Sequence, residues 1–234
     1  ILLPGAALPA AQIHDHESAD LADYDSRTGK IAPTKLQQAH AKRLKARVTW
    51  SKFGTPASLT RNGKALARGI RGKTAADAAR WYLKRHRALF GLGSLNQLAL
   101  VSANRLAGSN GYAVNFRQVF GQLHAAEGGQ VAVGVAGSKK RGWRVVYVSS
   151  GLTRDRALAG SARLSAAQAW VTAARTVGLR RSIVDVLSRK HARGWTQLGV
   201  SGLEAQSARL VAFPTVRSGV LPAFETLVLD TAKP

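Results

Sequence analysis

The sequence predicts an α+β fold of two helix-plus-antiparallel-sheet halves, preceded by an extended N-terminal segment. Two observations predict it. Alanine-rich stretches with helix-start signals, 74–90 and 165–178, are each followed by apparent strands. Those strands alternate apolar and polar residues, a period of two that is typical of antiparallel sheets with one buried face. The recurrence of a helix followed by strands indicates two similar halves.

Composition limits the classes of function. With 234 residues the chain can form one large or two small domains with a real core. Its 35 Lys+Arg against 12 Asp+Glu give a formal charge of +23, which attracts nucleic acid, anionic lipid or an acidic protein surface. The absence of cysteine excludes disulfides and thiolate metal sites.

The first 30 residues predict a leader. "ILLPGAALPA" resembles the end of a signal-peptide apolar region, with cleavage after Ala10 or Ala11. The chain contains no Met, so we expect a fragment or a processed form. A flexible Ala/Pro-rich tail is the alternative interpretation. No other stretch approaches the roughly 20 apolar residues of a membrane span. We therefore expect a secreted protein, with residues 1–30 as signal-peptide remnant and flexible leader.

Residues 31–72 predict an extended and helical N-terminal segment. A short helix is expected over 33–46, with Leu36, Ala39 and Leu44 as its apolar side. An extended stretch follows, "VTWSKFGTPASLTRNGKAL", broken by turns at Gly54, Pro56 and Asn62-Gly63.

Residues 73–160 are predicted to form the first helix-plus-sheet half. Thr74 and Asp77 form a capping box at the start of a helix over 74–90, which Gly91 ends. The buried helix face is expected to hold Ala75, Ala78, Tyr82 and Leu89. Strands are expected over 98–106, 112–120, 130–136 and 143–149, with an Asn110-Gly111 hairpin turn. Alternation predicts that their buried side chains are Tyr112, Val114, Phe116, Phe120, Val131, Val133, Val135, Trp143, Val145 and Tyr147.

Residues 161–234 are predicted to form the second helix-plus-sheet half. Ser165 and Gln168 form a capping box, and Gly178 ends the helix. The apolar stripe of this helix is expected to be Trp170, Ala173, Ala174 and Val177. Strands are expected over 208–214 and 220–229. The intervening region, 179–208, shows little periodicity, and its "RR" and "RKHAR" clusters are interpreted as basic loops open to proteases.

The sequence carries no catalytic signature. HExxH, GxSxG, a phosphate-binding P-loop and a cysteine nucleophile are all missing. The tail cluster of His14, Asp15, His16 and Glu17 has no further converging ligand, which disfavours a metal site. His86 is expected to be a partly buried structural residue, His124 to lie in a turn and His191 in a basic loop. We predict no catalytic, cofactor-binding or metal-binding residue in this segment.

Basic clusters occur at 42–47, 84–87, 139–141, 180–181 and 189–193. They are scattered over predicted helix, hairpin and loop, and aromatic residues make up only 6% of the chain. This distribution lacks the aromatic stacking platform of single-strand nucleic-acid binders. We therefore predict no nucleic-acid partner, and a basic surface that complements an acidic protein.

The stretch "YAVNFRQVFGQLHAAEGGQVAVGVAGSKKRGWRVVYVSSG" resembles the fungalysin/thermolysin propeptide motif. "VTWSKFGTPASL" and "AADAARWYLKRHRALFGL" resemble elements that precede it in pro-regions of fungalysin-type metalloproteases. "LSAAQAWVTAARTVG" and "ARLVAFPTVRSGVLPAFETLVLD" resemble a PepSY-like second half. The likeness spans about residues 47–230, although "GQLH" lacks the proline usual in that motif. The residues that carry it, and that it implies for an interaction role, are Trp50, Gly54, Pro56, Gln118, Gly121, Leu123, Gly128, Gly129, Val131, Val133 and Gly151.

The resemblance implies a cystatin-like α+β module that acts as chaperone and inhibitor of a downstream zinc metalloendopeptidase until it is removed. The zinc would belong to that downstream domain, and the partner would be that domain, with an acidic surface. We expect a monomer. Two alternatives stay open: a docking or regulatory module of a non-peptidase secreted protein, and a binder of nucleic acid or another anionic surface.

Overall fold

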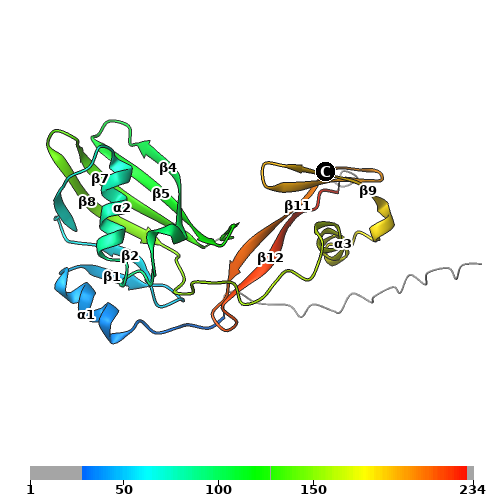
Figure 1. The fold of residues 1–234 in the computed structure, drawn as a ribbon, viewed down its shortest axis with the longest axis horizontal. Coiled ribbons are helices and arrows are strands. Elements are labelled where there is room, and N and C mark those ends of the chain that lie inside the picture. Colours follow the sequence, from blue (N-terminus) through cyan, green and yellow to red (C-terminus); the bar gives the residue numbers. More distant parts are fainter. Residues whose placement is uncertain (1–27, 127, 231–234) are drawn as a thin grey trace, which may run out of the picture.

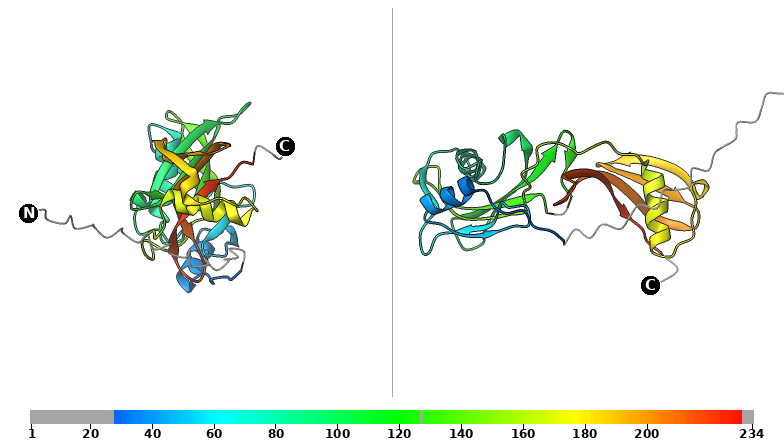
Figure 2. Two further views of the ribbon diagram at one scale, coloured as in Figure 1. Left: turned by 90° about the vertical axis from the view of Figure 1, so that its right-hand side faces the viewer. Right: turned by 90° about the horizontal axis from the view of Figure 1, so that it is seen from below.

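The structure is a computed structural model that describes residues 28–126 and 128–230. These residues form three α-helices and two antiparallel sheets of eight and four strands, which confirms the α+β prediction. Figure 1 shows the two sheets in separate halves that lie end to end, and Figure 2 shows a helix across the second sheet. The predicted leader up to residue 27, including its His/Asp/Glu cluster, lies outside the described residues.

The first half is built on the larger sheet, whose strand order is β1-β2-β8-β7-β5-β4. In this sheet β3 also pairs with β8, and β6 pairs with β5. The strands are β1 (Arg47–Trp50), β2 (Pro56–Thr60), β3 (Ala67–Ile70), β4 (Leu98–Arg105), β5 (Gly111–Phe120), β6 (Leu123–His124), β7 (Gln130–Ser138) and β8 (Gly142–Ser150).

The outer edge of β8 is shared by two strands. β2 pairs with its later part through Leu59 and Val148, and β3 pairs with its earlier part through Ile70 and Trp143. Residues 47–70 therefore contribute strands to the same sheet as residues 98–150.

Helix α2 (Ala75–Arg85) covers one face of this sheet. Its capping box is present, with the Asp77 amide donating to Thr74 Oγ1 at 3.1 Å and the Thr74 amide to Asp77 Oδ2 at 2.9 Å. Tyr82 and Leu83 are fully buried against the strands. The expected helix end at Phe90 was wrong. Residues after Arg85 form tighter turns, with the Leu89 amide donating to the His86 carbonyl at 2.9 Å, and these turns bury both Leu89 and Phe90.

Two details of the sheet differ from the expectation. The β7–β8 pairing shifts register where Gly134 faces Tyr147 and Val135 faces Val145, so Val146 is an extra, bulged residue. The bulge reverses the alternation, and Tyr147 is exposed whereas Val148 is buried.

The Asn110-Gly111 turn was also misplaced. The hairpin bend lies over residues 107–110 with Gly108 at φ +66°, and Gly111 is the first residue of β5.

Helix α1 (Lys35–Arg43) docks on the end of α2 through polar contacts. Gln37, itself buried, donates from Nε2 to the Leu89 carbonyl at 3.0 Å. His40 Nε2 lies 2.9 Å from His86 Nδ1, and the His86 ring packs 4.5 Å from the Tyr82 ring. His86 is buried as expected, at the end of α2. Burial lowers the pKa of His86 from 6.5 to about 4, with smaller contributions from the nearby His40 and Arg85.

This pair predicts an acid-sensitive first half. Between the ordinary pKa of 6.5 and the folded value of about 4, the unfolded chain takes up a proton on His86 that the folded chain does not, so stability falls as pH falls. Burial followed by Arg43 also lowers the pKa of His40, which acts in the same direction. We expect the free energy of unfolding, measured by urea denaturation, to drop by about 1 kcal/mol between about pH 7.5 and pH 5, because solvent screening reduces the full effect of the shift.

His86→Phe should flatten this pH dependence, because phenylalanine cannot take up the proton. His191→Gln, at an exposed site, should leave it unchanged. An equally steep pH dependence in His86→Phe would assign the acid sensitivity to other groups.

The second half consists of helix α3 (Ala166–Thr176) on a sheet of order β12-β11-β10-β9. Ser165 and Gln168 form the predicted capping box, and Gly178, at φ +87°, ends the helix as expected. Of the predicted stripe, Trp170 and Ala174 are buried, but Ala173 is half-buried and Val177 is exposed. The strands are β9 (Val186–Ala192), β10 (Trp195–Val200), β11 (Leu203–Pro214) and β12 (Val220–Leu227).

The prediction of irregular basic loops over 179–208 was wrong. Residues 186–200 form the β9–β10 hairpin, which places the "RKHAR" cluster on a strand and its turn, and His191 in β9 opposite Thr196. β11 also begins earlier than expected, at Leu203. The burial of Thr196, Leu198 and Val200 alternates with exposed neighbours, a period of two that the sequence already contained.

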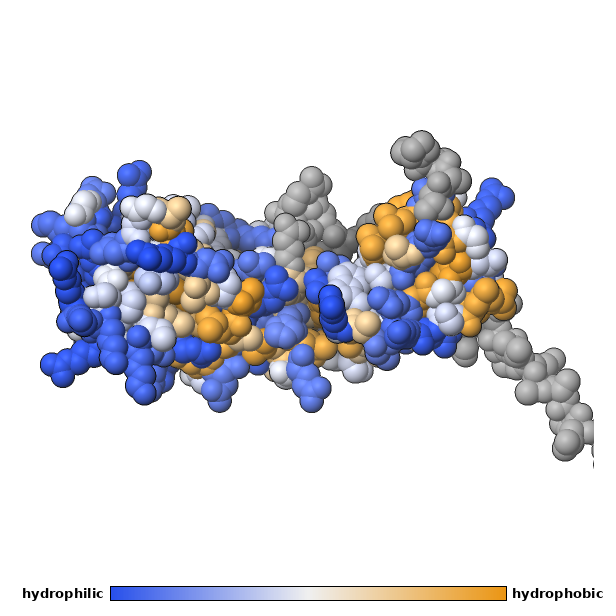
Figure 3. Space-filling view, turned by 90° about the horizontal axis from the view of Figure 1, so that it is seen from above, coloured by the Kyte–Doolittle hydropathy of each residue, from blue (hydrophilic) through white to orange (hydrophobic). Residues whose placement is uncertain are grey.

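Apolar residues also gather on the surface of the second half. Figure 3 shows them at the end away from the first half, whose own outer end is hydrophilic. The large exposed apolar residues of this half are Val177, Ile183, Val184, Leu187, Leu227 and Leu229.

Candidate functional site

The residues singled out from the sequence fall into two groups, and the first is a turn in the N-terminal segment. Trp50 ends β1 and pairs with Pro56 at the start of β2. Gly54, at φ +68°, lies so close to the backbone that an added Cβ would stand 2.8 Å from the Ala32 carbonyl oxygen. The neighbouring Thr55 donates from Oγ1 to the Leu152 carbonyl at 2.6 Å. This turn therefore ties the N-terminal segment to the end of β8.

The second group surrounds the connection from β5 to β7, which we call the crossing, and Gln118 at the end of β5 is at its centre. Its side chain is fully buried and pairs twice with the backbone of Thr153: Nε2 donates to the carbonyl at 3.0 Å, and the Thr153 amide donates to Oε1 at 3.1 Å. The Gln118 amide donates to the Gly129 carbonyl at 2.7 Å, and its carbonyl accepts from the Ala125 amide at 2.8 Å. Gln118 thus links the segments that contain Ala125, Gly129 and Thr153.

Four glycines permit this crossing to close. An added Cβ on Gly129 would overlap the Cβ of Ala125, and one on Gly151 would overlap the carbonyl oxygen of Gly128. Gly121 and Gly128 adopt φ +62° and +100°, which disfavour any residue with a side chain. Close packing therefore requires glycine at 129 and 151, and the backbone conformation favours it at 121 and 128.

The remaining members are apolar. Val131 and Val133 are buried in β7 beneath α2, so they belong to the core of the first half. Leu123 is half-buried in β6, where His124 also lies and not in the expected turn. Leu123 packs against a small cluster of buried residues that come from both halves.

We call this cluster the joint: Phe120, Ala125, Ala212 and Val220, with Leu123 and Leu158 packed against them. Two backbone hydrogen bonds cross it. The Ala126 amide donates to the Ala212 carbonyl at 2.7 Å, and the Ala159 amide donates to the Val220 carbonyl at 2.7 Å. The β11–β12 hairpin of the second half therefore holds the crossing that Gln118 organises in the first.

Beside the joint lies a cavity of about 700 Å³, which we call the joint groove. It receives residues from both halves and from the start of α3. It is lined by Arg117, Gln122, Leu123, His124, Ala125, Ser165, Ala166, Arg189, His191, Arg193, Gly194, Thr196, Arg209, Leu210, Val211 and Phe224.

The joint groove has a one-sided charge. No Asp or Glu is among the described residues that line it. The Arg209 guanidinium is already neutralised by Glu225, with contacts of 2.6 and 2.8 Å, and lies over the Trp195 ring. Arg117 Nε is buried without a hydrogen-bond partner among the described residues. The groove thus offers cations that the described part of the chain leaves unneutralised.

The groove was missed from the sequence because its basic residues are far apart in the chain. Arg117 lies in β5, whereas Arg189 and His191 lie in β9. Only the pairing of β9 with β10 and the joint bring them to one cavity.

The same effect gathers basic residues elsewhere. Arg71, Lys73 and the 139–141 cluster line a second hollow at the outer end of the first half, although they looked scattered along the chain.

The described residues contain no group of three or more His, Cys, Asp or Glu able to hold a metal ion. Among them, no helix combines the length and apolar character needed to cross a membrane.

Comparison with known proteins gives little more. No known family profile matches the chain, and no curated protein matches it in sequence. Among solved structures, the chain is similar to the YpeB C-terminal domain of Bacillus megaterium, with 12% identity and a TM-score of 0.35, over 86% of this chain and 100% of that one. At that TM-score the similarity supports no conclusion about function, which has to come from the chain's own residues.

Proposed function

We propose that the chain is a docking module, and specifically the pro-region of a secreted zinc metalloendopeptidase that chaperones and inhibits its catalytic domain. The observation that carries the proposal is the joint. Phe120, Leu123 and Ala125, which lie in the stretch that resembles the propeptide motif, join the two helix-on-sheet halves beside a cationic groove. Such an arrangement suits a binding surface to which both halves contribute.

Physical chemistry supports a role in binding. A pro-region that binds only the native protease stabilises that state by mass action. It also blocks access to the active site for as long as a large interface persists. A charge of +23 would steer it to an acidic catalytic domain and make inhibition weaken with added salt.

The alternative docking role, in a non-peptidase secreted protein, uses the same surface with a different partner. The two are separated by the reading frame beyond Pro234. An HExxH motif there supports the pro-region, and its absence favours the alternative.

The direct test is inhibition. Purified chain should inhibit a zinc metalloendopeptidase encoded in its own reading frame, and the inhibition should weaken at high salt. Refolding of the denatured catalytic domain should recover activity only when the chain is present. A peptidase that refolds and works equally well with and without the chain would refute the proposal. A gel shift with duplex and single-stranded DNA tests the nucleic-acid alternative, with steep salt dependence as its signature.

A further inference from the structure

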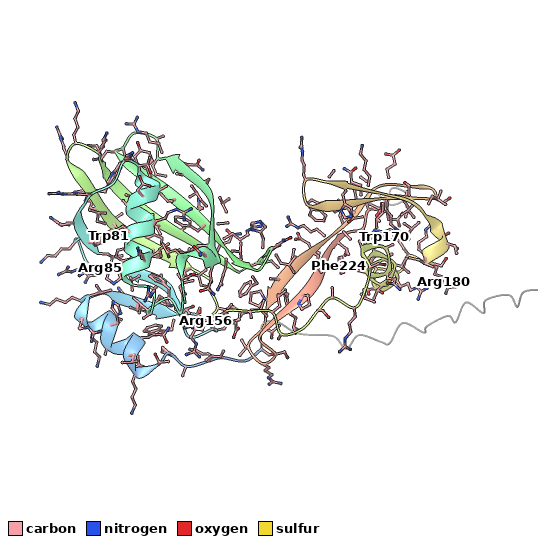
Figure 4. All side chains as sticks on the ribbon, viewed as in Figure 1. Trp81, Arg85, Arg156, Trp170, Arg180 and Phe224 are labelled. Carbon is pink, nitrogen blue, oxygen red and sulfur yellow. The ribbon has the colours of Figure 1, made fainter. Side chains whose placement is uncertain are left out.

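The joint groove combines an apolar floor with a cationic rim. The floor is formed by Leu123 from β6, Leu210 from β11 and Phe224 from β12, which are half-buried. Figure 4 shows Phe224 on β12, with Trp170 on the nearby helix α3. Thr196, also part of the floor, is buried. Because the apolar side chains of the floor are only half-buried, an apolar group placed on them would remove their remaining apolar surface from water.

The rim carries cations from both halves. Arg117 and His124 come from the first half, and Arg189, His191 and Arg193 come from the second. Apart from Arg117, these rim residues are exposed. A ligand with separated negative charges could therefore contact both halves at once.

We propose that the joint groove binds an extended acidic peptide segment in which carboxylates flank an apolar side chain. The apolar side chain occupies the floor, and the carboxylates pair with rim arginines, whose planar guanidinium matches a carboxylate with two hydrogen bonds. The volume of about 700 Å³ is in the range of pockets that enclose a few residues or a drug-sized molecule.

A peptide fits this groove better than a nucleic acid does. Single-stranded nucleic acid is held by aromatic faces on which bases stack. Phe224, which is half-buried, is the only Phe, Tyr or Trp among the described lining residues, and the imidazoles of His124 and His191 are the other rings. Trp195 lies on the opposite face of the sheet from Thr196, because neighbours on a strand alternate, and Arg209 lies over its ring at 4.5 Å.

This inference deepens the proposed function and rests on it for the source of the peptide, which would be a segment of the docking partner. The groove itself can be tested without that partner. Failure of peptide binding would leave inhibition of the peptidase intact, and failure of inhibition would leave peptide binding intact.

The probe is a fluorescein-labelled hexapeptide, Glu-Glu-Leu-Phe-Glu-Glu, titrated with the whole chain by fluorescence anisotropy. Two matched peptides replace either every Glu with Gln or Leu-Phe with Ser-Ser. We expect each replacement to weaken binding by at least about tenfold, because both the charges and the apolar side chains contribute.

Matched variants of the chain locate the site. Arg189→Gln with Arg193→Gln removes two rim charges, and Arg117→Gln removes a third. Arg68→Gln with Arg144→Gln removes two exposed charges of the first half away from the groove. We expect the rim pair to weaken binding by about tenfold or more, and the control pair by less than about twofold. Thermal melts verify that each variant is folded.

Three outcomes would overturn the inference. Equal weakening by the rim pair and the control pair would show attraction to net charge alone. Undiminished binding of the Ser-Ser peptide would show that the floor is not used. Displacement of the peptide by a single-stranded oligonucleotide at lower concentration than by unlabelled peptide would assign the groove to nucleic acid.

Discussion

Replacing Gly129 by alanine is expected to lower the free energy of unfolding by about 2–4 kcal/mol. The added methyl group would overlap the Cβ of Ala125, in a crossing where Gln118 is bonded to the backbone of both residues. The φ angle of Gly129 is not positive, so alanine can adopt this backbone conformation. The expected loss of stability therefore comes from the steric overlap. Urea denaturation with far-ultraviolet circular dichroism measures the loss.

A double-mutant cycle isolates the steric term. Ala125→Gly removes the methyl group that Gly129→Ala would meet, so the double variant should recover at least about 1.5 kcal/mol relative to the sum of the single variants. Additive losses would mean that the crossing is held by something other than the contact between these two residues.

Trp170→Ala is expected to unfold the second half while the first half stays folded. The side chain is fully buried and is the largest member of a small core, and its Nε1 donates to Gln206 at 3.2 Å and to the Leu227 carbonyl at 3.1 Å. Truncation of a buried tryptophan costs about 3–5 kcal/mol, a large share of the stability that one small core supplies.

Amide hydrogen exchange followed residue by residue measures this result. Protection should disappear over 186–227 and persist over 98–150. Trp81→Ala is the matched control, because Trp81 is 42% exposed and its described partner is Arg85, 5.6 Å from the ring centre. That variant should lose less than about 1 kcal/mol. If Trp170→Ala unfolded in a single transition and lost as little free energy of unfolding as Trp81→Ala, the prediction of two separate cores would be wrong.

Most of the first half could be predicted because its signals are local. The capping box of Thr74 and the alternation of Val114 and Phe116 depend on residues close in the chain. Tyr147 was misplaced because a bulge inserts one residue into β8, and no local pattern shows which strand will take the extra residue.

The second half was harder to predict because its polar strand faces hide the period. β9 is an edge strand whose residues are mostly exposed, so "RKHA" reads as a loop, although Thr196, Leu198 and Val200 already alternate in β10. The joint groove could not be predicted at all, since its residues meet only through tertiary contacts.

The divided edge of β8 gives the N-terminal segment a protective role. β2 pairs with Val148 and Ser149 on that side of the strand, and β3 pairs with Trp143 and Val145. If a protease removed residues 28–72, β8 would become an open edge beside a row of valines. Open edges of this kind recruit strands from other molecules, so the trimmed protein would tend to polymerise through strand addition. We therefore expect the N-terminal segment to prevent strand addition at the β8 edge of this sheet.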